Sequence, residues 1–128
     1  MKNRAICERM GFALAGIREA HAREQSFRIH VRTLAGAILA LLVLRPSAIW
    51  WAAIAIVAAL VLAFEMINSA LEGLVDLVHP EVHPEIKVVK DMASGAVLVA
   101  GFAAIVVAVC LLIAVGPRFL GELRGWIG

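Results

Sequence analysis

The chain has 128 residues, of which 62% are apolar, and a mean hydropathy of +0.92. Soluble domains carry about 45–50% apolar residues, so this composition indicates a membrane protein built as one small domain. The net charge is only +2, but residues 1–32 hold seven Lys or Arg and three Glu, whereas residues 65–91 hold six acidic residues and two Lys. The two cysteines, Cys7 and Cys110, indicate neither a disulfide framework nor a metal knuckle.

The first predicted element is an amphipathic surface helix over residues 1–28. Its apolar residues recur at intervals of three and four, with arginines between them: Ile6, Met10, Leu14 and Ile17. This pattern is typical of a helix that lies on the membrane surface. No apolar core follows a short basic segment, so we expect the N-terminus to be retained rather than cleaved.

Three membrane helices are predicted after this surface helix, over residues 29–44, 48–78 and 86–115. The segment 45–47 contains Pro46 and should form a tight turn, and Trp50 and Trp51 mark the interfacial start of the second helix. Gly116-Pro117 is expected to end the third helix. The fold class is therefore an all-α membrane protein.

Membrane orientation follows from the basic residues in the short flanking segments. The N-terminal arm, together with the loop before the third helix and the first residues of that helix, holds nine Lys or Arg, and the opposite side holds three. Because basic residues are enriched on the cytoplasmic side, the N-terminus and the 79–87 loop should face the cytoplasm.

A polar stripe follows the second membrane helix. Glu65, Asn68, Glu72 and Asp76 are spaced by three, four and four residues, which places them on one helix face. For Asp76, a solvated face beyond the membrane is an equally good explanation. Glu65 follows a long apolar run, and an ionisable group at that depth indicates a functional site inside a protein-lined cavity.

These residue types predict metal and phosphate chemistry. Carboxylates suit Mg²⁺, which prefers oxygen ligands and usually shares them with substrate phosphates. Lys87, Lys90, Asp91 and Ser94 begin the third helix and would lie near the stripe, although the two lysines also fit a cytoplasmic membrane flank. The sequence contains no glycine-rich phosphate loop, so a P-loop or protein-kinase site is excluded.

Several segments resemble the bacterial integral-membrane diacylglycerol kinase family. They are residues 64–72 (FEMINSALE), 75–77 (VDL) and 89–98 (VKDMASGAVL), with residues 16–18 and 24–30 upstream. The resemblance implies a homotrimer of three-helix subunits, each with an N-terminal surface helix, and active sites shared between neighbouring subunits. It also implies a multi-pass protein of the bacterial cytoplasmic membrane that uses ATP and Mg²⁺.

The resemblance also implies residue roles. Glu65 matches the catalytic base, which Asn68 would support, and Glu24 and Glu72 match the magnesium-binding carboxylates. Residues at nucleotide-contacting positions are Phe12, Glu24, Glu72, Asp76, Glu81, His83, Lys90 and Asp91. Residues at lipid-substrate positions are Arg18, Glu65 and Ser94. Two departures affect the nucleotide contacts: Val82 stands where the enterobacterial form has an aromatic residue, and Phe12 replaces a tyrosine.

The expected function is ATP-dependent phosphorylation of diacylglycerol to phosphatidic acid at the cytoplasmic face. Undecaprenol phosphorylation by the same site is an alternative, because residues 28–30 (RIH) and the paired His-Pro loop are similar to the Gram-positive branch of the family. A small trimeric cation channel or transporter using Glu65 and Glu72 is a second alternative. Residues 49–62 offer no polar group to a conduction path, which disfavours it. No nucleic-acid partner is expected.

Overall fold

The computed structural model describes residues 5–81 and 83–127, and the elements within this part are all helices. They are α1 (Ile6–Arg23), α2 (Gln25–Leu44), α3 (Ala48–Val78) and α4 (Pro84–Ile127). The last three are long and apolar enough to cross a membrane, which confirms the all-α class with three helices of membrane-spanning length. Val82 and positions 1–4 of the expected surface helix lie outside the described residues.

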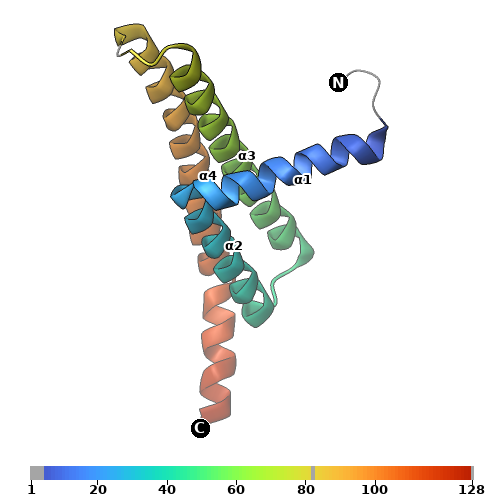
Figure 1. The fold of residues 1–128 in the computed structure, drawn as a ribbon. Helices are drawn as coiled ribbons and strands as arrows, with labels where there is room; N and C mark the ends of the chain where they lie inside the picture. The colour runs from blue at the N-terminus through green and yellow to red at the C-terminus, as the bar shows by residue number, and fades with distance from the viewer. Residues whose placement is uncertain (1–4, 82, 128) are drawn as a thin grey trace.

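The helices are arranged as an elongated bundle with one arm (Figure 1). α3 and α4 run antiparallel and form the main packing contact of the molecule, and α2 packs against α3. α1 projects sideways from the bundle, and its residues are exposed or, for Ala20, half-buried. The α3–α4 turn lies at one end of the molecule, whereas the C-terminus lies at the other.

The boundary between α1 and α2 lies at Glu24 rather than between residues 28 and 29. Glu24 has an extended backbone (φ −96°, ψ 117°), so the chain changes direction there without proline or glycine. The Arg28 guanidinium donates hydrogen bonds of 3.0 Å to the carbonyl oxygens of His21 and Ala22. These bonds satisfy carbonyls that the end of α1 leaves without a partner in its own helix. Phe27, one turn into α2, is 3% exposed, so the packed part of the bundle begins there.

The turn between α2 and α3 is tight, and α3 coincides with the expected second membrane helix. Arg45 ends α2 in the left-handed region (φ 46°, ψ 54°), a conformation that glycine usually supplies at this position. Next to this turn lies the main hydrophobic cluster, formed by Leu41, Leu44, Ile54, Leu111 and Val115. The cluster joins α2, α3 and α4 at the end of the bundle away from the α3–α4 turn.

Helix α4 departs from the predicted range at both ends. It begins at Pro84, which suits the first helical turn because proline has no N–H to leave unpaired, and His83 Nδ1 accepts a 3.2 Å hydrogen bond from the Glu85 N–H. The prediction that Gly116-Pro117 ends the helix is wrong, because α4 continues through Pro117 to Ile127. Proline removes one backbone hydrogen bond, and a helix can continue past it when neighbouring groups compensate.

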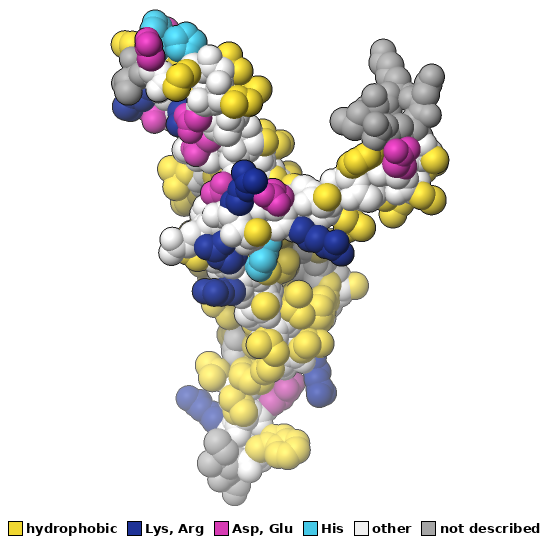
Figure 2. Space-filling view, viewed as in Figure 1, with side chains coloured by type: hydrophobic (Ala, Val, Ile, Leu, Met, Phe, Trp, Pro, Cys, Tyr) yellow, Lys and Arg dark blue, Asp and Glu magenta, His cyan; other side chains and the backbone are white. Residues whose placement is uncertain are grey.

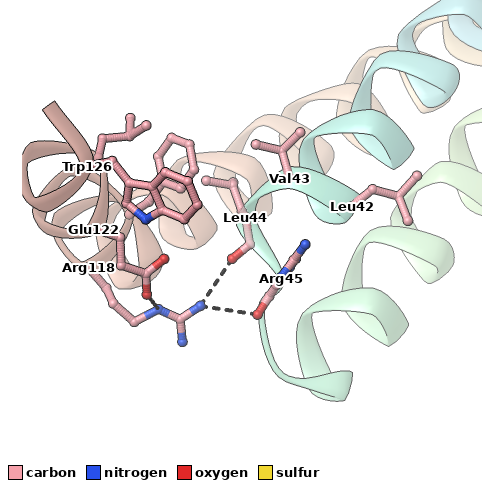
Figure 3. Close-up of a pocket in the computed structure, with 9 residues that line it drawn as sticks. Leu42, Val43, Leu44, Arg45, Arg118, Glu122 and Trp126 are labelled. Atoms are coloured by element: carbon pink, nitrogen blue, oxygen red, sulfur yellow. Dashed lines mark hydrogen bonds and ion pairs between the residues drawn. The ribbon is translucent and has the colours of Figure 1, made fainter.

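A side-chain contact secures α4 just after this proline (Figure 3). One Arg118 nitrogen donates 3.2 Å hydrogen bonds to the carbonyl oxygens of both Leu44 and Arg45, at the end of α2. The same guanidinium lies 3.5 Å from Glu122, one turn along α4. Arg118 therefore caps α2 from another helix and ties the C-terminal part of α4 to the bundle.

Charged side chains are distributed unevenly over the surface (Figure 2). On the face shown, charged and histidine side chains gather where α3 meets α4 and along the bundle end of α1, whereas hydrophobic side chains dominate below α1. Many large apolar side chains on the membrane-spanning helices are exposed. Such a surface suits contact with lipid or with other membrane helices.

Candidate active site

The candidate site lies at the polar end of a groove of about 740 Å³ between α2, α3 and α4. Its walls are mainly small or branched apolar residues, among them Ala37, Val57, Ala58, Val61, Val97, Gly101 and Ala104. Polar side chains that also line the groove are Ser26, His30, Thr33, Glu65 and Ser94. An apolar groove with a few polar groups is the usual form of a site for an amphiphilic ligand.

Glu65 on α3 is the central polar group of the groove. It is 5% exposed, and among the described residues it is the one charged residue that is buried. Its carboxylate oxygen lies 3.8 Å from His30 Nε2 on α2. Burial of a carboxylate is costly unless it is paired or used, so this position indicates a chemical function.

A polar chain continues from Glu65 along α3 toward the α3–α4 turn. The Asn68 side-chain amide donates a 3.3 Å hydrogen bond to a Glu72 carboxylate oxygen, and Ser94 Oγ lies 3.5 Å from the Asn68 carbonyl oxygen. The structure therefore joins three of the predicted residues from two helices. Asn68 contacts Glu72 and Ser94 here, and its support of Glu65 stays a prediction.

Two lysines pair with acids where the two long helices meet. Lys90 Nζ lies 2.9 Å from Asp76 Oδ1, which links α4 to α3. Lys87 pairs instead with Asp91, one turn along the same helix. These contacts place two cations and two acids near the α3–α4 turn, beyond the polar end of the groove.

The remaining predicted residues are spread over the turn and α1. Glu81 is exposed in the α3–α4 turn, and His83 caps α4 through its ring nitrogen. Phe12 and Arg18 lie on the exposed face of α1, which projects away from the groove. No contact between described residues of the chain brings Arg18 to Glu65 or Ser94. Within the described part of this chain, therefore, the predicted set does not form one compact site.

The two proposed magnesium ligands, Glu24 and Glu72, have the right donor chemistry. Glu72 is half-buried and uses one carboxylate oxygen for the Asn68 amide, while Glu24 is half-buried at the α1–α2 break. Neither carboxylate forms a salt bridge with a described lysine or arginine. In residues 5–81 and 83–127, no group of three or more His, Cys, Asp or Glu gathers in one place. A Mg²⁺ ion does not require such a group, because it usually binds one or two protein carboxylates together with water and phosphate oxygens.

Sequence reasoning missed the polar face of α2. Ser26, His30 and Thr33 all line the groove, and their spacing of four and three places them on one side of a helix. This spacing is present in the sequence, but the predicted boundary between residues 28 and 29 separates Ser26 from His30 and Thr33. The site therefore contains a histidine, His30, that was not among the predicted site residues.

A second pocket of about 610 Å³ lies at the opposite end of the bundle (Figure 3). It is lined by Leu42, Val43, Leu44, Arg45, Arg118, Phe119, Glu122, Leu123 and Trp126. None of the predicted site residues lines it, and Arg118 there is engaged in capping α2.

A family model and three known proteins are similar to this chain. The sequence model of the prokaryotic diacylglycerol kinase family matches residues 11–112, a range that includes each predicted site residue. A Synechocystis protein named diacylglycerol kinase is 43% identical over 103 residues, which cover 80% of this chain and 59% of that protein. A Sinorhizobium protein of the same name is 37% identical over 75 residues, which cover 59% of this chain and 55% of that one.

A relative with a different named substrate also matches. The undecaprenol kinase of Bacillus subtilis is 34% identical over 84 residues, which cover 66% of this chain and 68% of that protein. The chain thus spans less than two thirds of the two diacylglycerol kinases and slightly more of the undecaprenol kinase. Because the family model covers well over half of its length, this chain belongs to the prokaryotic diacylglycerol kinase family.

Proposed function

We propose that this protein transfers the γ-phosphoryl group of ATP to the hydroxyl of a membrane lipid, with diacylglycerol as the substrate and phosphatidic acid as the product. One observation carries the proposal: the buried carboxylate of Glu65 lies at the polar end of an apolar groove. Family membership supports the same reaction class. The groove would hold the hydrocarbon chains, and its polar end would hold the alcohol.

Glu65 would act as the general base on the lipid hydroxyl. As its carboxylate accepts the hydroxyl proton, the lipid oxygen forms a bond to the γ-phosphorus, and the bond from that phosphorus to the β,γ-bridging oxygen breaks. The bond electrons leave with ADP. Catalysis of this kind depends on positioning and on stabilising charge that spreads over the phosphoryl oxygens.

The groups beyond the groove would bind the nucleotide. Lys90 would stabilise phosphate charge, since a lysine ammonium can exchange its Asp76 partner for a phosphate oxygen. Glu24 and Glu72 would hold Mg²⁺, which supplies shielding of the phosphate charges when bound. The Asn68 hydrogen bond would keep the Glu72 carboxylate oriented toward the site. Phe12, Asp76, Glu81, His83 and Asp91 would complete the nucleotide contacts, and Arg18 and Ser94 the lipid contacts.

A homotrimer with shared active sites would account for the scattered positions of these residues. The predicted nucleotide and metal residues are divided among α1, the α3–α4 turn and the ends of α3 and α4. The exposed apolar surface of the membrane helices offers area for subunit contacts. In this proposal α1 lies on the cytoplasmic membrane surface, and both the N-terminus and the α3–α4 turn face the cytoplasm.

The substrate can be tested with purified protein in mixed micelles supplied with radiolabelled ATP and either diacylglycerol or undecaprenol. We expect transfer of label to diacylglycerol. Transfer to undecaprenol alone would assign this chain the activity named for its Bacillus relative. Absence of transfer to either alcohol, in protein that remains folded, would overturn the kinase proposal.

The role of Glu65 is tested by Glu65→Gln, which keeps the size of the side chain and removes its basicity. Turnover should decrease by about a hundredfold or more, while the KM for ATP changes little. Glu19→Gln is the matched control, because Glu19 forms an exposed ion pair with Arg23 on α1 and does not line the groove. A folded Glu65→Gln variant with wild-type turnover would exclude Glu65 as the base.

A further inference from the structure

The general base of the proposed reaction is buried, and this creates a second chemical requirement. Glu65 gains one proton in each turnover and must lose it before the next lipid can react. Its side chain is 6% exposed and faces a groove whose walls are mainly apolar. A carboxyl group buried in this way has little contact with bulk water, so a neighbouring group that accepts its proton would speed the return of Glu65 to the carboxylate.

His30 is the group placed to accept it. Its Nε2 atom lies 3.8 Å from a Glu65 carboxylate oxygen, and its own side chain is 30% exposed. This distance exceeds a direct hydrogen bond of about 2.7–3.2 Å, so a small rotation of either side chain, or one bridging water, would connect the two groups. The imidazole therefore lies between the buried carboxyl group and the surface.

The other groups around the groove do not offer this function. Among the described residues that line it, Glu65 and His30 are the side chains with a carboxylate or an imidazole nitrogen that can accept a proton, and α4 contributes only the hydroxyl of Ser94 on its polar side. On α2 itself, the Arg28 guanidinium is bonded to the last carbonyls of α1, and Arg32 is exposed and does not line the groove. Arginine also remains protonated and cannot accept a proton.

We infer that His30 is a proton-relay residue that acts through Glu65, an inference that rests on the proposed kinase function. After phosphoryl transfer, the proton of the neutral Glu65 carboxyl group passes to Nε2 of the neutral imidazole. This regenerates the carboxylate and leaves an imidazolium ion, which then releases a proton to water from its exposed side. Histidine suits this step because its ring can accept a proton at one nitrogen and release a proton from the other.

The test uses full-length His30→Ala and His30→Gln in the mixed-micelle kinase assay, with and without added imidazole. We expect both variants to lose turnover by roughly tenfold or more, with little change in the KM for ATP or lipid. Imidazole, which can enter the space left in His30→Ala, should restore much of the lost turnover in that variant and little in His30→Gln. His21→Ala is the control, because His21 lies on α1, outside the groove, and its ring contacts Phe27.

The outcomes separate this inference from the proposed function. Unchanged turnover in folded His30→Gln would overturn the relay while leaving the kinase assignment intact. A loss of turnover that imidazole does not restore in folded His30→Ala would assign His30 a packing role between α2 and α3. Absence of kinase activity in the wild-type protein would instead overturn the proposed function itself.

Discussion

Lys90 on α4 and Asp76 on α3 form an ion pair of 2.9 Å between residues that lie 14 positions apart in the chain. The pair links the two longest helices close to their connecting turn. Both side chains are accessible from the surface, so a nucleotide phosphate could replace the Asp76 carboxylate as the partner of Lys90. The contact therefore connects the fold of the α3–α4 hairpin to the proposed binding of ATP.

Replacing Lys90 by methionine should weaken ATP use more than it weakens folding. We expect the KM for Mg-ATP to rise by about tenfold or more, since a hydrogen bond between charged groups contributes about 1.5–3 kcal/mol. Thermal stability should change little, because exposed ion pairs contribute little to folding. Lys90→Arg keeps the positive charge and should retain most of the affinity. An unchanged KM in Lys90→Met would remove Lys90 from the nucleotide site.

Loss of either proposed magnesium ligand should change the metal requirement. Glu24→Gln and Glu72→Gln each remove a negative oxygen ligand, so we expect each variant to need more Mg²⁺ for half-maximal activity. The measurement is a magnesium titration at fixed ATP in the micelle assay. Glu85→Gln is a control, because Glu85 is an exposed acid in the first turn of α4. If both variants kept the wild-type magnesium dependence, these ligands would be wrongly assigned.

Filling the groove should weaken binding of the lipid and leave binding of the nucleotide unchanged. Gly101 lines the groove, and apart from its chain neighbours and the backbone of its own helix no atom lies within 4 Å of the position that its Cβ would take, so Gly101→Leu should extend into open space. We expect the KM for the lipid to rise several-fold, while the KM for ATP stays the same. Ala103→Leu, on an exposed face of the same helix and outside the groove, should change neither value. An equal effect of both substitutions would argue against lipid binding in this groove.

Arg118→Ala should destabilise the bundle without direct damage to the site. The substitution removes two hydrogen bonds to the carbonyls of Leu44 and Arg45, so we expect a loss of about 1–3 kcal/mol in the free energy of unfolding. Thermal or denaturant unfolding in detergent measures the change. Arg124→Ala removes the same charge from a side chain that forms no hydrogen bond with any described residue, and it should change stability little. Equal stability of the two variants would show that the cap contributes nothing measurable.

The local character of helices explains how much of this fold follows from the sequence. A long apolar run requires a helix in a bilayer because its backbone groups must be satisfied within the segment, which predicts three spans. Pro46 likewise predicts the α2–α3 turn, because proline restricts its own backbone and that of its neighbour. The spacing of Glu65, Asn68 and Glu72 predicts a shared helix face in the same way.

Contacts between helices lie beyond such local rules. The sequence predicts that the last helix ends at Pro117. In the structure α4 continues to Ile127, and Arg118 donates hydrogen bonds to the carbonyls at the end of α2. The break at Glu24 has no sequence signature, since neither proline nor glycine stands there. In the structure, Arg28 on the following helix donates hydrogen bonds to the last carbonyls of α1. In both places an arginine side chain donates hydrogen bonds to carbonyls at the end of another helix.

The same division applies to the candidate site. The sequence by itself determined that Glu65 lies at depth within an apolar helix and that acids and lysines gather near the α3–α4 turn. Only the tertiary structure decided that His30 faces Glu65, because the packing of α2 against α3 places them 3.8 Å apart although 35 positions separate them in the chain. Helical periodicity sets which residues share a face of one helix, whereas the rotation and crossing of two helices set which faces meet.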